Sequence, residues 1–158
     1  MTQITLTQYE LFQAGMVALQ RNVENIFAGR EHAHGFGGSN GWTNHIEGAA
    51  GELAFAKWSN KFWSGNVGDL TANDVGKVEV RTASDHNRRL IIHKKDPDDR
   101  RFVLVTGIAP TFRIRGWIWG EDAKQEQYWQ DPVGGRPAYF IPHNQLNPMT
   151  TTKQARAA

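Results

Sequence analysis

Residues 102–107, with the sequence Phe-Val-Leu-Val-Thr-Gly, form a continuous apolar run of strand length. Such a run is typical of a central strand that is buried on both faces of a sheet. Around it, the chain reads in order as two helices, several strands, a short helix and a final strand. We therefore predict an α/β (α+β) fold in which helices flank a central mixed β-sheet.

The first helix is predicted by a capping box, in which Thr7 is the N-cap and Glu10 follows three residues later. Apolar residues then recur at steps of three and four and form one stripe, which consists of Tyr9, Phe12, Met16, Leu19, Val23 and Ile26. We expect this stripe to pack on a sheet, with contact to a partner helix as the alternative. A second helix is expected from Asn44, which precedes Glu47 with capping-box spacing, to about Ser59.

The composition limits the class of protein. The 158 residues, 39% of them hydrophobic, suffice for one domain, which we place at residues 1–148, with a frayed tail at 149–158. The absence of cysteine excludes disulfides, thiolate metal sites and cysteine nucleophiles. The N-terminus does not resemble a signal peptide, and no apolar segment approaches the roughly 20 residues that span a bilayer. We therefore expect a cytoplasmic protein without a membrane partner, and its net charge of +2 permits a polyanionic one.

Residues 77–82, Lys-Val-Glu-Val-Arg-Thr, predict a strand with one apolar and one charged face. Val78 and Val80 can face a core, whereas Glu79 and Arg81 share the other side. Asp69 lies ten residues before the glutamate, and we expect it on the first arm of a hairpin that leads into this strand. If Asp69 lies beside the charged face, two carboxylates and a cation converge, which is enough to hold a divalent metal against a phosphate. The alternative is a solvated amphipathic edge strand.

Glu52 lies in an unusual place on the second predicted helix. Its helical neighbours, Ala49, Phe55 and Ala56, are small or apolar. The glutamate therefore lies at the rim of the core or points into a site, and a partly buried position would favour a raised pKa.

Histidines were considered as metal ligands because His32 and His34 lie in the glycine-rich segment 29–42 and His45 follows it. Their spacing matches no zinc-binding pattern, and the chain has no cysteine to complete such a site.

Residues 112–119 alternate, so that Phe112, Ile114 and Ile118 should share one side of a strand. The other side would carry two arginines followed by Trp117 and Trp119. Such a face can grip a phosphate backbone and stack on bases, or it can pack beneath a covering helix. The basic residues expected to contact DNA are Arg88, Arg89, Lys94, Arg113 and Arg115.

The ordered set of Glu52, Asp69 and the Glu79-Val-Arg81 triplet, followed by strands with apolar centres, resembles the PD-(D/E)XK nuclease superfamily over residues 44–119. This resemblance implies a restriction-endonuclease-like core that hydrolyses phosphodiester bonds of DNA with Mg²⁺ or Mn²⁺. It also implies that Asp69 and Glu79 hold the metal, that Glu52 assists directly or through water, and that Arg81 occupies the position of the family's lysine.

The chain departs from the pattern of this superfamily at two positions. Gly68 stands where the name-giving proline would precede Asp69, and that proline performs no chemistry. Arg81 keeps the positive charge of the lysine, but it stays protonated and cannot act as a base. Residues 101–123 are also similar to small phage-borne members of the superfamily, which suggests a phage protein acting in the host cytoplasm.

Three interpretations of the sequence follow. The first is a Mg²⁺-dependent nuclease that acts on DNA. The second is a catalytically inactive nuclease-fold module that binds nucleic acid or protein, and the third is an unrelated accessory protein whose charged strand is a solvated face. A homodimer is possible, but the sequence does not identify a self-complementary face.

Overall fold

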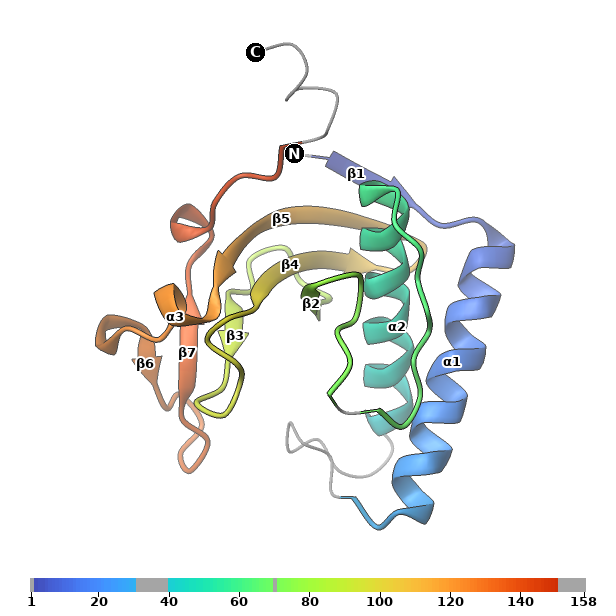
Figure 1. The fold of residues 1–158 in the computed structure, drawn as a ribbon, viewed down its shortest axis with the longest axis horizontal. Coiled ribbons are helices and arrows are strands. Elements are labelled where there is room, and N and C mark those ends of the chain that lie inside the picture. The colour runs from blue at the N-terminus through green and yellow to red at the C-terminus, as the bar shows by residue number, and fades with distance from the viewer. Residues whose placement is uncertain (1, 31–39, 70, 151–158) are drawn as a thin grey trace.

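The computed structural model describes residues 2–30, 40–69 and 71–150 of the chain. Two long helices, α1 (Gln8–Phe27) and α2 (Asn40–Ser59), lie side by side (Figure 1). The strands in chain order are β1 (Thr2–Thr5), β2 (Val78–Ala83), β3 (Leu90–Ile92), β4 (Arg101–Ile108), β5 (Thr111–Trp119), β6 (Trp129–Gln130) and β7 (Ala138–Ile141). The short helical segments are α3 (Gly120–Ala123), η1 (Glu126–Tyr128) and η2 (His143–Gln145).

The larger sheet is mixed and has the strand order β1-β5-β4-β2. β2 pairs with β4 in parallel, whereas β4 with β5 and β5 with β1 are antiparallel. Residues 102–107 of β4 are all buried at the centre of this sheet, which confirms the prediction from the apolar run. β2 is an edge strand, and this position determines the character of the site described below.

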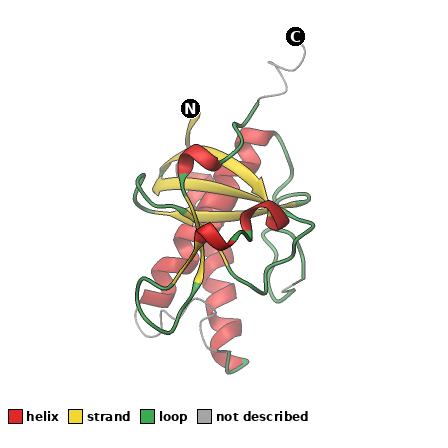
Figure 2. Ribbon diagram, turned by 90° about the vertical axis from the view of Figure 1, so that its left-hand side faces the viewer, coloured by secondary structure: helices red, strands yellow, loops and turns green. Residues whose placement is uncertain are grey.

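The two faces of the larger sheet are covered in different ways. α2 packs on one face, and α1 packs on α2 on the side away from the strands (Figures 1 and 2). A second sheet, of order β3-β7-β6, packs against the other face. The buried residues of this second contact include Leu90, Ile92, Phe102, Leu104, Ile118 and Ile141. The predicted mixed α/β fold with helices on the sheet is therefore confirmed, and the layer on the other face is itself a sheet.

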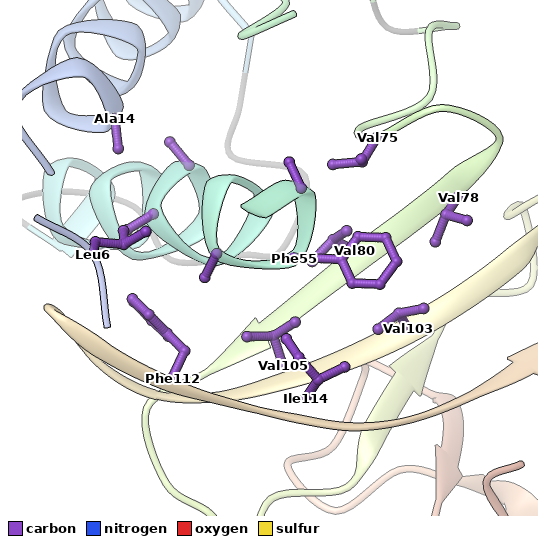
Figure 3. Close-up of a cluster of buried hydrophobic side chains, with 14 of the residues drawn as sticks. Leu6, Ala14, Phe55, Val75, Val78, Val80, Val103, Val105, Phe112 and Ile114 are labelled. Atoms are coloured by element: carbon purple, nitrogen blue, oxygen red, sulfur yellow. The ribbon is translucent and has the colours of Figure 1, made fainter. Parts of the chain in front are cut away.

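The main hydrophobic cluster lies between the long helices and the larger sheet (Figure 3). Small side chains supply its helix side, among them Ala14 and Ala18 of α1 and Ala49, Ala50, Ala54 and Ala56 of α2. Branched and aromatic residues of the strands fill the sheet side. Met149, the first residue of the predicted tail, packs against this cluster, whereas residues 151–158 lie outside the described part of the chain. None of the helices in the described ranges is long and apolar enough to cross a membrane.

A β-bulge changes which face of the sheet the side chains of β5 point to. Leu104 lies opposite Gly116, but the next residue, Val105, lies opposite Ile114, so one residue of β5 is unpaired. Phe112 and Ile114 accordingly belong to the main cluster, whereas Ile118 belongs to the second one. The prediction that Ile118 shares a side with the other two is wrong, because strict alternation assumes an unbroken strand register.

The capping box predicted at Thr7 is confirmed, since Thr7 Oγ1 accepts from the Glu10 amide and the Glu10 carboxylate accepts from the Thr7 amide. The stripe of this helix, however, does not pack on the sheet: Tyr9, Phe12 and the rest of the stripe are exposed. α2 already covers the sheet on this side, and α1 contacts α2 through a different face that includes Ala14 and Ala18.

The second helix begins at Asn40, four residues before the predicted start. Asn44 therefore lies within the helix, and the prediction of a capping box at Asn44 and Glu47 is wrong. Gly41 lies in the first turn of this helix, although glycine costs helix stability relative to alanine. Local capping and propensity signals therefore do not locate the start of α2.

Two glycines of α2 allow a matched test of how closely this helix approaches β2. A Cβ atom added at Gly51 would lie 2.0 Å from Thr82 Oγ1, whereas one added at Gly48 would meet nothing within 4 Å. We expect Gly48→Ala to stabilise the protein by about 0.5–1 kcal/mol through helix propensity. Gly51→Ala should destabilise it by about 1–3 kcal/mol, because the added methyl group forces the helix and strand apart. Chemical denaturation of both variants tests this, and equal effects would contradict the close contact.

Candidate functional site

The predicted charged strand is β2, and its side chains divide as expected. Val78 and Val80 belong to the main cluster, whereas the Arg81 guanidinium on the opposite face lies 5.2 Å from the centre of the Phe102 ring. β2 is an edge strand, as the alternative interpretation required. Glu79 is nevertheless only 9% exposed, so the carboxylate is not part of a solvated face.

Glu79 is neutralised by two arginines. Arg100 Nη1 donates to Glu79 Oε1 at 2.5 Å, and Arg81 Nη1 lies 3.8 Å from Oε2. Arg100 also donates to the Thr71 carbonyl at 2.9 Å, which ties the loop before β2 to the start of β4. The two guanidinium groups thus give this buried carboxylate close partners of opposite charge.

Arg81 is held by a second acid, Asp96. Its Nη2 donates to Asp96 Oδ2 at 3.1 Å, and the same oxygen accepts from the His93 amide at 2.9 Å. Burial acts to raise the pKa of Asp96, but the hydrogen bonds from His93 and the charge of Arg81 outweigh it and hold that pKa well below its usual range. Asp96 therefore stays ionised and fixes the guanidinium beside Glu79.

Glu52 points away from solvent, toward α1 and the connection that follows α2. Its oxygens accept two parallel bonds from Arg21, at 2.7 and 2.9 Å, and a third from Trp63 Nε1 at 3.0 Å. At 6% exposure the residue is buried, and the bidentate pair is the strong form of this interaction. Burial acts to lower the pKa of Arg21, but Glu52 and the charge of Asp74 outweigh it and raise that pKa.

Asp74 is the residue of this site that the sequence analysis missed. Val75 and Val78 pair across a tight turn, and the Asp74 carboxylate accepts from the Val80 amide at 2.7 Å along the free edge of β2. Burial raises the pKa of Asp74 to about 7, and the negative charges of Glu52 and Glu79 add to this shift. Three carboxylates from the helix, the turn and the strand thus influence one another. The sequence feature that could have indicated Asp74 is its short spacing from Glu79 within a turn-rich interval.

Asp69 occupies a different environment. Its Oδ1 accepts from Thr71 Oγ1 at 2.7 Å, from the Thr71 amide at 2.9 Å and from the Ala72 amide at 3.2 Å. These bonds, the Thr71 side chain first, lower the pKa of this exposed carboxyl. The prediction of a hairpin arm at Asp69 is wrong, because the residue lies in an irregular segment. We therefore assign the second carboxylate of the site to Asp74, whose charge couples to Glu52 and Glu79.

The donor set of this site consists of hard oxygen atoms, which fit Mg²⁺ or Mn²⁺. Within the described ranges, no three His, Cys, Asp or Glu side chains are gathered closely enough to form a complete metal-binding group. Mg²⁺ does not require one, since it commonly keeps several waters and binds through one or two carboxylates and the substrate phosphates. Asp74 and Glu79 can supply these carboxylates.

Two of the three histidines considered as metal ligands, His32 and His34, lie outside the described residues. The third, His45, is half-buried in α2, and its Nε2 lies 3.4 Å from Asn25 Nδ2 of α1.

The basic residues predicted to contact DNA are distributed around the second sheet and β5. Arg89 bonds to Gln130 and stacks over Phe140. Arg115 Nη2 lies 2.8 Å from His143 Nδ1, and the other ring nitrogen of His143 contacts the Arg88 carbonyl. Arg113 is half-buried beside an open hollow, while Lys94 is exposed near Lys124. Trp117 packs against the main cluster after the bulge, so it does not extend the face that carries Arg113.

Comparison of the chain with protein-family models, curated proteins and solved structures finds no match to any of them. The assignment of this site consequently depends on its geometry and charge.

Asp74 should make the stability of the protein depend on pH. Its pKa of about 7 in the folded chain exceeds the value of about 4 of an unfolded aspartate. Its stabilising contribution is therefore complete below pH 4 and is lost as the pH rises through 7. In Asp74→Asn, the unfolding free energy should decrease less between pH 5 and 8 than in the wild type. At pH 8 the variant should be more stable than the wild type by at least about 1 kcal/mol. Parallel stability curves of the two proteins would contradict this environment for Asp74.

Arg21 should contribute more to stability than an exposed cation does. Arg21→Met leaves the buried Glu52 without its bidentate partner, which costs about 3–5 kcal/mol at neutral pH. Lys57→Met breaks the exposed pair with Glu10 and should cost less than about 1 kcal/mol. Urea denaturation compares the two, and similar losses would contradict a buried role for Glu52.

Proposed function

We propose that this protein is a metal-dependent phosphodiester hydrolase acting on DNA, with a core of the restriction-endonuclease type. The observation that carries the proposal is the buried Asp74 carboxylate at the edge of β2, which accepts from the Val80 amide at 2.7 Å. Burial, with the charges of Glu52 and Glu79, raises the pKa of this carboxyl to about 7. Placing like charges together in a poorly solvated region is costly unless a cation shares them. Strongly perturbed carboxyls of this kind are concentrated at functional sites.

In this proposal, Asp74 and Glu79 hold one Mg²⁺ or Mn²⁺ ion. Glu52, whose oxygens already accept bonds from Arg21 and Trp63, assists through water. A bound divalent ion lowers the pKa of a coordinated water and balances charge on a phosphate. Asp74 loses its proton when the site is loaded, so the affinity for the metal should increase as the pH rises through 7.

The arginines hold the phosphate of the substrate. Arg81 is fixed in place by Asp96 at 3.1 Å, and its Nε is buried without a hydrogen-bond partner among the described residues. A guanidinium cannot accept a proton, so Arg81 stabilises negative charge and does not act as a base. Arg100, which donates to Glu79, would be free to contact the phosphate if an ion took its place beside that carboxylate. The basic residues around β5 and the second sheet extend this contact along the DNA backbone.

A module that binds nucleic acid without cutting it is the second candidate. The observation in its favour is that the arginines already balance the carboxylates: Arg21 pairs with Glu52 at 2.7 Å and Arg100 with Glu79 at 2.5 Å. Such a site keeps a positive surface for phosphate and needs no metal ion.

A nuclease assay separates the two candidates. Purified protein is incubated with linear, nicked, branched and single-stranded DNA in Mg²⁺, Mn²⁺ or EDTA. We expect metal-dependent cleavage, and a loss of at least about 100-fold in Asp74→Asn and Glu79→Gln, because each variant removes a charged ligand while keeping the side-chain shape. Asp69→Asn is the matched control and should cleave normally, since its carboxylate only caps a turn.

Each alternative outcome has a defined meaning. DNA binding without cleavage in any metal supports the second candidate. Loss of cleavage in Asp69→Asn, with Asp74→Asn still active, would mean that Asp69 and not Asp74 holds the metal. Binding isotherms for Mn²⁺ alone, measured at pH 6 and pH 8, test the expected competition between the metal and the Asp74 proton independently of DNA.

A further inference from the structure

The outer face of α1 is an exposed apolar stripe made of Tyr9, Phe12, Met16, Leu19, Val23 and Ile26, which we call the α1 stripe. Its residues are between 39% and 71% exposed, and Phe27 beside its end is 88% exposed. The inner face of the same helix, which includes Ala14, Ala18 and Asn22, is buried. α1 therefore has two packing faces, and only the inner one has its partner within the described chain.

The spacing of the α1 stripe is that of a helix-pairing surface. Its steps are three, four, three, four and three residues, which is the strict heptad pattern of a two-helix seam. The pattern extends over 18 residues, which corresponds to a rise of about 26 Å along the helix. The flanking positions Gln13 and Gln20 are uncharged, so a second helix with the same flanks meets no repulsion of like charges.

The exposed area is large enough for a stable pair. From the exposed fractions, the α1 stripe presents roughly 700 Å², more than the largest apolar patch of a typical monomer. Two such stripes facing each other bury about 1,400 Å² in total, which lies within the range of specific protein interfaces.

We infer that the α1 stripe is the interface with a second copy of this chain, in which the two α1 helices pair antiparallel about a two-fold axis near residues 17 and 18. The distribution of side-chain size favours this direction. The stripe has aromatic residues at its start, Tyr9 and Phe12, and smaller branched residues at its end, Val23 and Ile26. Antiparallel pairing places large residues opposite small ones at both ends and keeps the helix separation uniform. It also aligns the helix dipoles favourably.

A membrane surface is a poorer match for the α1 stripe. Helices that lie on membranes carry many lysines and arginines on their polar face. The charged residues of α1 are Glu10, Arg21 and Glu24, which give the helix a negative net charge. Arg21 also bonds to Glu52 on the inner side, so a dimer through the outer face leaves the candidate site open. The inference is therefore independent of the proposed function.

Sedimentation equilibrium tests the association. The wild-type protein should form a dimer in a concentration-dependent manner, and Leu19→Lys should weaken the dimer by at least about 100-fold, because it buries an unpaired charge at the centre of the seam. Leu19 is already partly exposed in the single chain, and circular dichroism confirms that the variant folds. Ile108→Lys, at an apolar position that is 65% exposed on β4, is the matched control and should leave the association unchanged.

Cysteine cross-linking tests the direction, since the chain has no other thiol. Tyr9→Cys and Ile26→Cys proteins are oxidised separately and as a mixture. Antiparallel pairing places residue 9 opposite residue 26 of the second copy, so a disulfide-linked dimer should form only in the mixture. Cross-links within either separate sample would overturn the antiparallel arrangement. A wild-type protein that is monomeric at about 1 mM, or that uses Leu19 to bind phosphatidylcholine–phosphatidylserine vesicles as a monomer, would overturn the interface itself.

Discussion

The close approach of α2 to β2 determines how the rest of the molecule is arranged. Gly51 lies so close to Thr82 that no side chain fits between helix and strand, and the next residue along the helix is Glu52. The contact therefore fixes the position of the Glu52 carboxylate relative to the edge of the sheet. It also leaves no access to this face of the sheet for α1, which packs on α2 instead (Figure 1). The apolar stripe of α1 therefore stays exposed.

Charge balance is the second constraint on the structure. Two of the acids near the edge of β2 are paired with arginines: Glu52 with Arg21 of α1, and Glu79 with Arg81 of β2 and Arg100 of the loop before β4. The Arg21–Glu52 and Arg100–Glu79 pairs link segments that are distant in the sequence, so these charges hold the two helices, the strand and the connecting loop together. Breaking one pair leaves an uncompensated charge in a poorly solvated region, which costs more than the pair itself contributes.

The sequence predicted those elements whose signal is local. The apolar run of β4, the charged strand β2 and the capping box at Thr7 follow from patterns within ten residues. The errors involve contacts between elements. The bulge opposite Leu104 turns Ile118 to the other face of the sheet. The start of α2 depends on packing. The α1 stripe has the same periodicity whether it contacts a sheet, a helix or solvent. In the site, the residues next to Glu52, Glu79 and Arg81 in the sequence indicated a special role for these three. Asp74 could not be predicted in this way, because only the turn that brings it against Val80 places it in the site.

Asp74 serves a structural purpose that does not by itself explain its charge. Its carboxylate accepts the Val80 amide on the free side of an edge strand, and so satisfies a backbone donor that would otherwise be open to pairing with another chain. An asparagine has an oxygen of the same shape and could accept this bond without ionising. For an aspartate at this position, burial and the like charges of Glu52 and Glu79 raise the pKa to about 7. The negative charge is therefore costly to the fold and unnecessary for the hydrogen bond, and the cation that we propose between Asp74 and Glu79 would give it a use.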